Sequence, residues 1–263
     1  MKRAMRTIAV TLGLLLPGCA GISTAPTQEE VRTLAPMGKL RVGLYLGGPP
    51  NVVRDAASGE MRGVGYDLGK ELATRLGVPF EPIVYPTVAG VVDGAKSGEW
   101  DVACLTDIPQ RAAIMDFTAP FIAIEHGYLV TANSTMRTVA DVDHPGIRVG
   151  VPKNGALEPI LMRNIKNAQV VPGPGLAGVL EMLKSGKVDA FAANKANLFE
   201  MSDRLPGSRV LDGRIAVDHI SIAVVKGRRS ALPFLETFVA DAKSQGLVKA
   251  ASARAGLRGA IDE

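Results

Sequence analysis

Asp101 to Phe121 reads DVACLTDIPQRAAIMDFTAPF, and the interpretation of the whole chain starts from this stretch. It opens as a short apolar run that ends at Thr106 and passes through a polar turn to a lone Arg111. The stretch ends in DFTAPF, which contains a proline, and a helix cannot continue through it. A strand end that brings a hydroxyl and a guanidinium to the same edge can bind a carboxylate. We therefore expect an anion-binding edge at Thr106 and Arg111.

The N-terminal residues predict export from the cytoplasm. Three basic side chains within the first six residues precede an uncharged run at 7–16, which is too short to span a bilayer as a mature helix. We interpret residues 1–18 as a signal peptide. The motif Leu-Pro-Gly-Cys at 16–19 resembles a bacterial lipobox, in which the cysteine becomes the lipidated first residue. A lipidated Cys19 would anchor the protein to the membrane, whereas ordinary cleavage would release a soluble periplasmic protein.

Composition excludes several classes of protein. The chain has 263 residues and is 47% hydrophobic, which suffices for one domain or for two lobes of about 100 residues each. Removal of the signal peptide takes three of the 30 basic residues and leaves 27 − 26 = +1 against the 26 acidic residues. No block of like charge indicates a nucleic-acid partner.

The three histidines are scattered without metal-ligand spacing, and we expect neither a metal nor a cofactor. Only Cys19 and Cys104 are present, so lipidation of Cys19 would leave no intramolecular disulfide.

Strands and helices alternate downstream of a predicted tether at 19–37. The apolar spacing predicts strands at 40–45, 80–85, 101–105, 146–151, 169–171, 188–192 and 219–225, with an extended segment at 127–131. It predicts helices at 27–34, 65–77, 87–98, 157–165, 176–183 and 230–242, and a last helix after 246. This alternation indicates an α/β fold with parallel sheets, in which ligands bind beyond the carboxyl ends of the strands. Tyr45, Thr106 and the loop after Tyr85 would lie at that edge.

Two segments of the chain align without a gap at an offset of 88 residues. AGVVDGAKSGEWDVACLT at 89–106 and AGVLEMLKSGKVDAFAAN at 177–194 share seven identities in 18 positions. The similarity reflects either a duplicated unit or the convergence of helix–glycine–strand units on one pattern. Both explanations give Thr106 and Asn194 equivalent places, each just past a strand end.

The repeated pattern predicts two lobes that face each other across a cleft. We assign residues 38–127 and 222–263 to lobe 1 and residues 128–221 to lobe 2. Two chain crossings, near 127–131 and 219–223, would form a hinge that closes on a ligand. Nothing in the sequence indicates an obligate oligomer, so we expect a monomer.

Five segments, in this order and spacing, resemble the bacterial extracellular solute-binding proteins of family 3, which serve amino-acid-type ABC transporters. They are GYDLGKELATRLG (65–77), PQRAAIMDFTAPF (109–121), RVGV (148–151), SGKVDAF (185–191) and ISIAVVKG (220–227). The resemblance runs from residue 40 to the last helix. It implies a type II periplasmic binding protein with two α/β lobes, a binding rather than catalytic role, and an ABC permease as partner.

The resemblance also implies roles for particular residues. In the family pattern, the arginine before the Asp-Phe-Ser/Thr segment clamps the ligand's α-carboxylate, helped by a hydroxyl five residues earlier; these are Arg111 and Thr106 here. A planar guanidinium matches a carboxylate with two parallel hydrogen bonds. A salt bridge at a loop is the alternative role for Arg111. The remaining predicted ligand-binding residues are Tyr45, Asn51, Tyr85, Asn154, Gly155, Ala156 and Asn194.

This sequence departs from the family pattern on the second lobe. The family places an acidic residue where Asn194 stands, and an amide carries no charge to pair with a ligand's ammonium group. Gly155-Ala156 replaces the family's Gly-Ser/Thr and removes a hydroxyl. The residues therefore predict a carboxylate clamp without an ammonium clamp. The expected ligand is a small carboxylate-bearing solute, such as an organic acid or an amino-acid-like compound.

Two other functions remain open from the sequence. The same architecture hosts periplasmic dehydratases that act on prephenate-like acids, and such chemistry needs a positioned acid or histidine in the cleft. Asp107 and Glu158 are the nearby candidates, and we interpret each as a solvated loop charge. A sensory module that uses the fold without transport is the second alternative.

Overall fold

The computed structural model describes residues 25–55 and 57–261, so the predicted signal peptide and Cys19 lie outside the described residues. Within these ranges no helix combines the length and the apolar character needed to cross a membrane. In chain order the elements are α1 (Gln28–Leu34), β1 (Leu40–Tyr45), β2 (Val53–Arg54), β3 (Met61–Arg62), α2 (Val64–Leu76), β4 (Phe80–Tyr85), α3 (Val88–Ser97), β5 (Val102–Thr106), α4 (Pro109–Ala112), β6 (Met115–Val130), η1 (Val139–Asp141), β7 (Arg148–Pro152), α5 (Leu157–Asn164), β8 (Gln169–Gly173), α6 (Gly175–Lys184), β9 (Ala190–Asn194), α7 (Lys195–Ser202), β10 (Arg209–Val210), β11 (Val217–Val225), η2 (Arg229–Ala231), α8 (Leu232–Ser244), α9 (Leu247–Ala255) and β12 (Ala260–Ile261).

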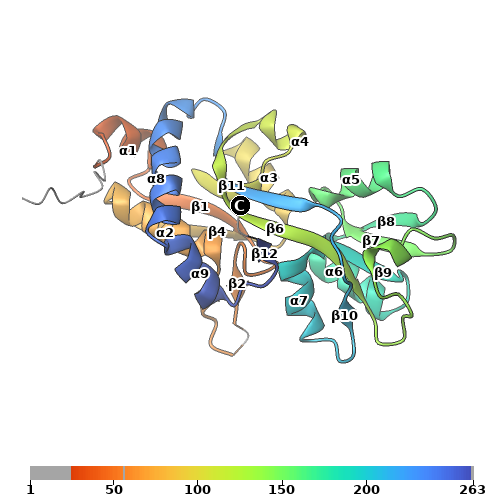
Figure 1. Ribbon diagram of the computed structural model, residues 1–263. Coiled ribbons are helices and arrows are strands. Elements are labelled where there is room, and N and C mark those ends of the chain that lie inside the picture. The colour runs from red at the N-terminus through yellow and green to blue at the C-terminus, as the bar shows by residue number, and fades with distance from the viewer. Residues whose placement is uncertain (1–24, 56, 262–263) are drawn as a thin grey trace, which may run out of the picture.

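The strands form a continuous path in the order β4-β1-β5-β11-β6-β9-β7-β8. β1 pairs in parallel with β4 and β5, and β7 pairs in parallel with β8 and β9, which confirms the predicted α/β class. We call β1, β4 and β5 with α1–α3, α8 and α9 the first half, and β7–β9 with α5–α7 the second half. The long strand β6 runs from one half into the other (Figure 1).

The DFTAPF segment is part of β6, a strand that the sequence analysis did not predict. Pro120 lacks the N–H that a strand interior needs. The structure accommodates it opposite Ser221 of β11, where the register between the two strands shifts on both sides of the pair. A proline at such an irregularity removes no regular ladder bond, so the strand continues to Val130.

The two halves repeat each other in strand register as well as in sequence. Val42 pairs with Val102 between β1 and β5, and Val149 pairs with Ala190 between β7 and β9. The partners on β5 and β9 are separated by the same 88 positions that relate the two aligned segments. Thr106 and Asn194 are the last residues of β5 and β9, whereas the sequence predicted that each lies just past its strand.

In each repeat an arginine–aspartate pair lies at the end of the sheet away from Thr106 or Asn194. Asp101 Oδ2 accepts hydrogen bonds from the backbone N and the Nε of Arg41, both at 3.0 Å. Asp189 Oδ2 accepts the same two bonds from Arg148, at 2.8 and 2.9 Å. Burial opposes the ionisation of Asp101, but the bonds from Arg41 and from Arg228 outweigh it and lower the pKa of this carboxyl. These pairs tie the start of the first strand to the start of the last one in each repeat.

The hydrophobic side chains pack into separate clusters in the two halves. The clusters of the first half draw on residues 31–124 and 220–257, and those of the second half on residues 128–216. Ala196 of α7 is the exception, because it packs into the core of the first half. The lobe boundaries that the sequence suggests remain a prediction.

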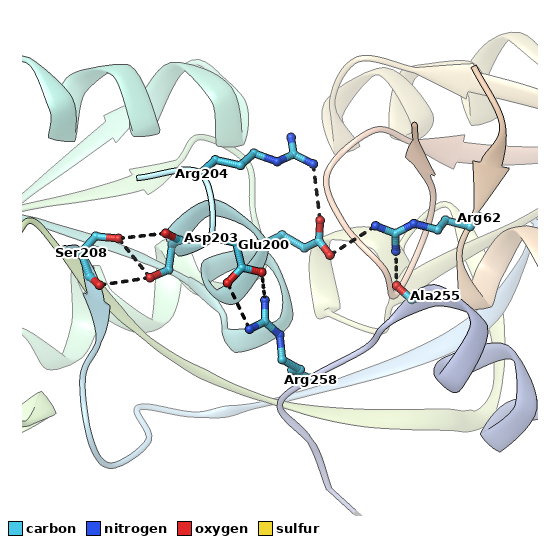
Figure 2. Close-up of polar contacts among 8 residues, drawn as sticks. Arg62, Glu200, Asp203, Arg204, Ser208, Ala255 and Arg258 are labelled. Atoms are coloured by element: carbon cyan, nitrogen blue, oxygen red, sulfur yellow. Dashed lines mark hydrogen bonds and ion pairs between the residues drawn. The ribbon is translucent and has the colours of Figure 1, made fainter. Parts of the chain in front are cut away.

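Ion pairs connect α7 of the second half to the first half (Figure 2). Arg62 of β3 donates Nη2 to Glu200 Oε1 at 3.4 Å and Nη1 to the carbonyl oxygen of Ala255. Arg258, between α9 and β12, pairs with Asp203, and its guanidinium lies 4.9 Å from the ring centre of Phe199. We call Arg62, Glu200, Asp203 and Arg258 the α7 ion-pair cluster.

Candidate functional site

The two halves touch each other across the cleft. Leu176 of α6 lies so close to Gly47 that a Cβ on the glycine would come within 2.6 Å of its Cδ1. A Cβ on Gly48 would come within 1.8 Å of Asn197 Oδ1. Only glycine permits this approach of the backbone to the opposite half. The structure therefore represents a closed arrangement of the two halves.

A cavity of about 70 Å³ lies between the halves, lined by residues from both of them and from the crossing strands β6 and β11. Its polar lining residues are Tyr45, Thr106, Arg111, His126, Asn194, Asn197 and Asp218. Gly155 and Ala156 also line it, as the sequence analysis expected. A wider opening of about 750 Å³ shares Arg111 and Gly155 with this cavity and also includes Asn154. Arg111 thus lies where the opening meets the cavity.

Arg111 is a buried guanidinium without a carboxylate partner. Pro109 opens the short helix α4, which carries Arg111 back over the end of β5. The side chain is 4% exposed, and its Nη1 donates to the carbonyl oxygen of Thr106 at 3.0 Å. In the part of the chain that the structure describes, Arg111 forms no ion pair. Burial lowers the pKa of Arg111, and the neighbouring Tyr45 and Asp218 act in the opposite direction.

Thr106 and Asn194 lie on opposite walls of the cavity. The carbonyl of Thr106 orients Arg111, while its hydroxyl forms no hydrogen bond with the other described residues. Asn194 is the N-cap of α7, and its Oδ1 accepts a bond from the backbone N of Asn197 at 3.0 Å. Because the cap occupies the carbonyl oxygen, Asn194 presents its amide NH₂ as a donor. This residue therefore offers no charged partner to an ammonium group.

His126 and Asp218 also line the cavity, and the sequence analysis did not assign either of them to the site. They are 4% and 6% exposed, and His126 Nε2 lies 3.8 Å from Asp218 Oδ2. Burial lowers the pKa of His126, and the Asp218 carboxylate only partly opposes this effect. A neutral imidazole therefore lies beside a buried carboxylate.

Sequence reasoning missed Asp218 because only the fold brings it to Arg111. A signal was present: Asp218 is a charged residue at the start of the strand VDHISIAVV, which is otherwise largely apolar. His126 pairs with Asn194 between β6 and β9, which places the imidazole at the junction of the two halves.

Tyr45 stands at the cavity as predicted. Burial raises the pKa of its phenol to about 12; the Asp218 carboxylate acts in the same direction and the Arg111 guanidinium opposes it. The phenol is therefore protonated at neutral pH. Arg111 and Asp218 line the same cavity as this phenol.

Asn51 and Tyr85 do not lie at the cavity. Asn51 Oδ1 accepts a bond from the backbone N of Tyr45 at 2.8 Å, and its Nδ2 donates to the carbonyl oxygen of Cys104 at 2.7 Å. These bonds fasten the loop after β1 to the sheet. Tyr85 packs against α3 and donates its hydroxyl to Glu99 Oε2 at 2.7 Å. The expectation that these two residues bind ligand is not supported by their positions.

Within residues 25–55 and 57–261 no group of three or more His, Cys, Asp or Glu side chains could hold a metal ion. The remaining cysteine, Cys104, is buried in β5. Burial raises the pKa of its thiol to about 12. It is a packing residue rather than a reactive thiol.

Comparisons with known proteins agree on one family. The sequence model for bacterial extracellular solute-binding proteins, family 3, matches residues 40–254. A probable histidine-binding protein of Campylobacter jejuni is 28% identical over 202 residues, which cover 74% of this chain and 75% of that protein.

Two solved structures share the fold. The solute receptor for L-cysteine of Neisseria gonorrhoeae superposes with a TM-score of 0.77 at 23% identity and covers 89% of this chain and 99% of its own. An ancestral amino-acid-binding protein, described as a precursor of cyclohexadienyl dehydratase, superposes with a TM-score of 0.74 at 22% identity. It covers 86% of this chain and 98% of its own. At these identities the two structures show the architecture, which is that of the type II periplasmic amino-acid-binding proteins.

Proposed function

The chain belongs to family 3 of the bacterial extracellular solute-binding proteins, and we propose that it captures a small carboxylate-bearing solute for an ABC permease. Members of this family bind amino acids outside the cytoplasm and work with ABC transporters. The solute would lie between the two halves, with its carboxylate on Arg111 and the Thr106 hydroxyl.

The buried, unpaired guanidinium of Arg111 is the observation that carries this proposal. A buried charge without a counter-ion costs free energy, so a fold retains one where a ligand supplies the counter-ion. Thr106 already holds one N–H of the guanidinium, which fixes its orientation before any ligand arrives. The other N–H groups can then meet a carboxylate with little loss of side-chain entropy.

The size of the cavity limits the solute. A water molecule needs about 10–15 Å³ of such space, so the 70 Å³ cavity holds roughly five to seven groups of that size. This matches a compact acid or a small amino acid.

We also propose that the protein works in the periplasm as a monomer attached by a lipid on Cys19. The basic start, the short apolar run and the Leu-Pro-Gly-Cys motif support this. Intact-mass measurement of the protein from membranes tests it. A mature chain that begins at Cys19 with added acyl mass supports the anchor, and cleavage elsewhere without such mass contradicts it.

The binding function is tested by thermal-shift screening of small acids and amino acids, followed by calorimetric titration of the hits. The matched variant is Arg111→Gln, which keeps a polar side chain and removes the charge. We expect each hit to bind the variant at least about 100-fold more weakly, because two charge-assisted hydrogen bonds of about 1.5–3 kcal/mol are lost. Equal affinity for the wild type and the variant would overturn the assignment of Arg111.

A further inference from the structure

We propose that Asp218 recognises a cationic group on the solute, so that the cleft is built for a small zwitterion. The ammonium group would donate to the carboxylate of Asp218, while the carboxylate of the same solute lies on Arg111. This inference rests on the proposed binding function and assigns the partner that Asn194 cannot provide.

Asp218, a residue that lines the cavity, has an unused acceptor oxygen. Its Oδ1 is buried and has no hydrogen-bond partner, and the residue is 6% exposed. Two further buried atoms without a partner, His126 Nδ1 and Asn197 Oδ1, belong to residues that line the same cavity. Buried polar atoms are normally satisfied, and unsatisfied ones that gather around one cavity indicate a ligand that supplies the missing groups. Asp218 and Asn197 both lack a donor, and an ammonium group is a donor with three N–H bonds.

Asp218 also lacks a cationic partner in the part of the chain that the structure describes. Among the described residues, its one charged-group contact within ion-pair range is the imidazole of His126 at 3.8 Å. Burial lowers the pKa of that imidazole and favours its neutral form, so it does not balance the charge. The neighbouring cation Lys195 is engaged with Glu125 at 2.7 Å. A ligand cation would therefore meet a carboxylate that no side chain has neutralised.

The two charges of the site remain apart although they share one cavity. Arg111 and Asp218 both line it and influence each other electrostatically, yet the described residues include no ion pair between them. If they closed on each other, the site would be self-neutralised. Because both line one cavity of about 70 Å³, a small solute with opposite charges a few bonds apart can meet both. An α-amino acid with a short side chain has this arrangement.

The test compares two solutes of equal size against Asp218→Asn, which keeps the shape of the side chain and removes its charge. L-Alanine carries the ammonium group, and L-lactate has a hydroxyl in its place. We expect wild-type protein to bind L-alanine more tightly than L-lactate in calorimetric titrations. Asp218→Asn should weaken L-alanine binding by about 10- to 150-fold and change L-lactate binding by less than about threefold.

A second variant tests whether a carboxylate on the opposite wall can replace that of Asp218. In the double variant Asp218→Asn, Asn194→Asp, the new carboxylate faces the cavity and still caps α7. It should restore part of the preference for L-alanine. Asp107→Asn, at an exposed position after β5, is the matched control and should bind both solutes like the wild type.

The outcomes separate this inference from the proposed function. If Arg111→Gln loses both solutes while Asp218→Asn binds L-alanine as tightly as the wild type, the carboxylate clamp stands and the role of Asp218 is overturned. If Asp218→Asn weakens the two solutes equally, Asp218 is a structural residue and the inference also fails. If wild-type protein binds neither solute at millimolar concentration, a small zwitterion is not its ligand and the inference is again overturned.

Discussion

At Arg111 the demands of binding and of stability oppose each other. The guanidinium is 4% exposed and has no counter-ion among the described residues, so the unliganded fold bears the cost of burying it. We predict that Arg111→Met, which keeps much of the side-chain volume, raises the free energy of unfolding by about 1 kcal/mol or more and abolishes ligand binding. Urea titration without ligand measures the first effect and calorimetry the second.

Arg163→Met is the matched control for this prediction. Arg163 is exposed at the wide opening, and its replacement should change the free energy of unfolding by no more than about 0.5 kcal/mol. A lower urea midpoint for Arg111→Met than for the control would contradict the account. It would show that the guanidinium stabilises the unliganded fold.

His126 makes stability depend on pH. Burial lowers its pKa in the folded state below the ordinary value of about 6.5, which applies to the unfolded chain. The unfolded state therefore binds more protons below that pH, and the folded state loses stability as pH falls from about 6.5 towards the lowered pKa. We predict that His126→Gln removes this loss, as measured by urea midpoints between about pH 5 and 7.

The exposed His144 provides the control for this titration. His144→Gln should keep the wild-type dependence on pH over the same range. If His126→Gln and the wild type lose stability in parallel as the pH falls, the imidazole is not the group that titrates.

The sequence led to the proposed carboxylate clamp but not to Asp218. Arg111 and Thr106 are five positions apart, and a local motif is enough to link them. Asp218 reaches the cavity only because β11 returns antiparallel to both β5 and β6, and no local pattern encodes that return. The residue type of Asn51 could not distinguish a ligand-binding amide from one that holds a loop in place, and in the structure its amide bonds to Tyr45 and Cys104.

The paired elements of the two halves offer a matched comparison. Asp101 and Asp189 make the same bonds to Arg41 and Arg148, but the side chain of Asp101 is fully buried and that of Asp189 is 32% exposed. We predict that Asp101→Asn lowers the free energy of unfolding by about 3–5 kcal/mol, because Arg41 and Arg228 lose the buried carboxylate that pairs with them. Asp189→Asn should cost about 1 kcal/mol or less, because solvent screens that pair.

Urea unfolding at neutral pH compares the two variants directly. Both carboxyls have a lowered pKa, so both are ionised there, and their contribution would be lost only as pH falls below about 4. If both variants lower the free energy of unfolding by the same amount, burial does not determine how much each ion pair contributes to stability.

Most regular elements could be predicted because amphipathic spacing survives in the sequence, as in α2 and α3. The elements that were missed lack that signal for identifiable reasons. β6 contains Pro120, and α7 packs on both halves rather than presenting one apolar face, as the burial of Ala196 and Leu198 shows. β2, β3, β10 and β12 have two residues each, which is too short for any periodicity.

For the whole molecule, the closed arrangement is held by contacts on both sides of α7. The α7 ion-pair cluster joins this helix to β3 and to the segment before β12 (Figure 2). We predict that Glu200→Gln weakens the binding of every ligand by the same factor of about two to five, because it reduces the stability of the closed state without touching the cavity. Calorimetry with two different solutes measures the factor for each.

Glu181→Gln serves as the control, since Glu181 pairs with Lys184 within α6 and does not connect the halves. It should leave both affinities unchanged. A loss specific to one solute, or a loss equal to that of the control, would show that the cluster does not stabilise closure.

The central claim is that this cleft holds a carboxylate on Arg111, and a crystal structure of the complex with its solute tests it most directly. The account predicts both carboxylate oxygens at about 2.7–3.2 Å from guanidinium nitrogens of Arg111, with the Thr106 hydroxyl on one of them. A solute bound between the halves with its carboxylate on other residues, and Arg111 still without a partner, would contradict it.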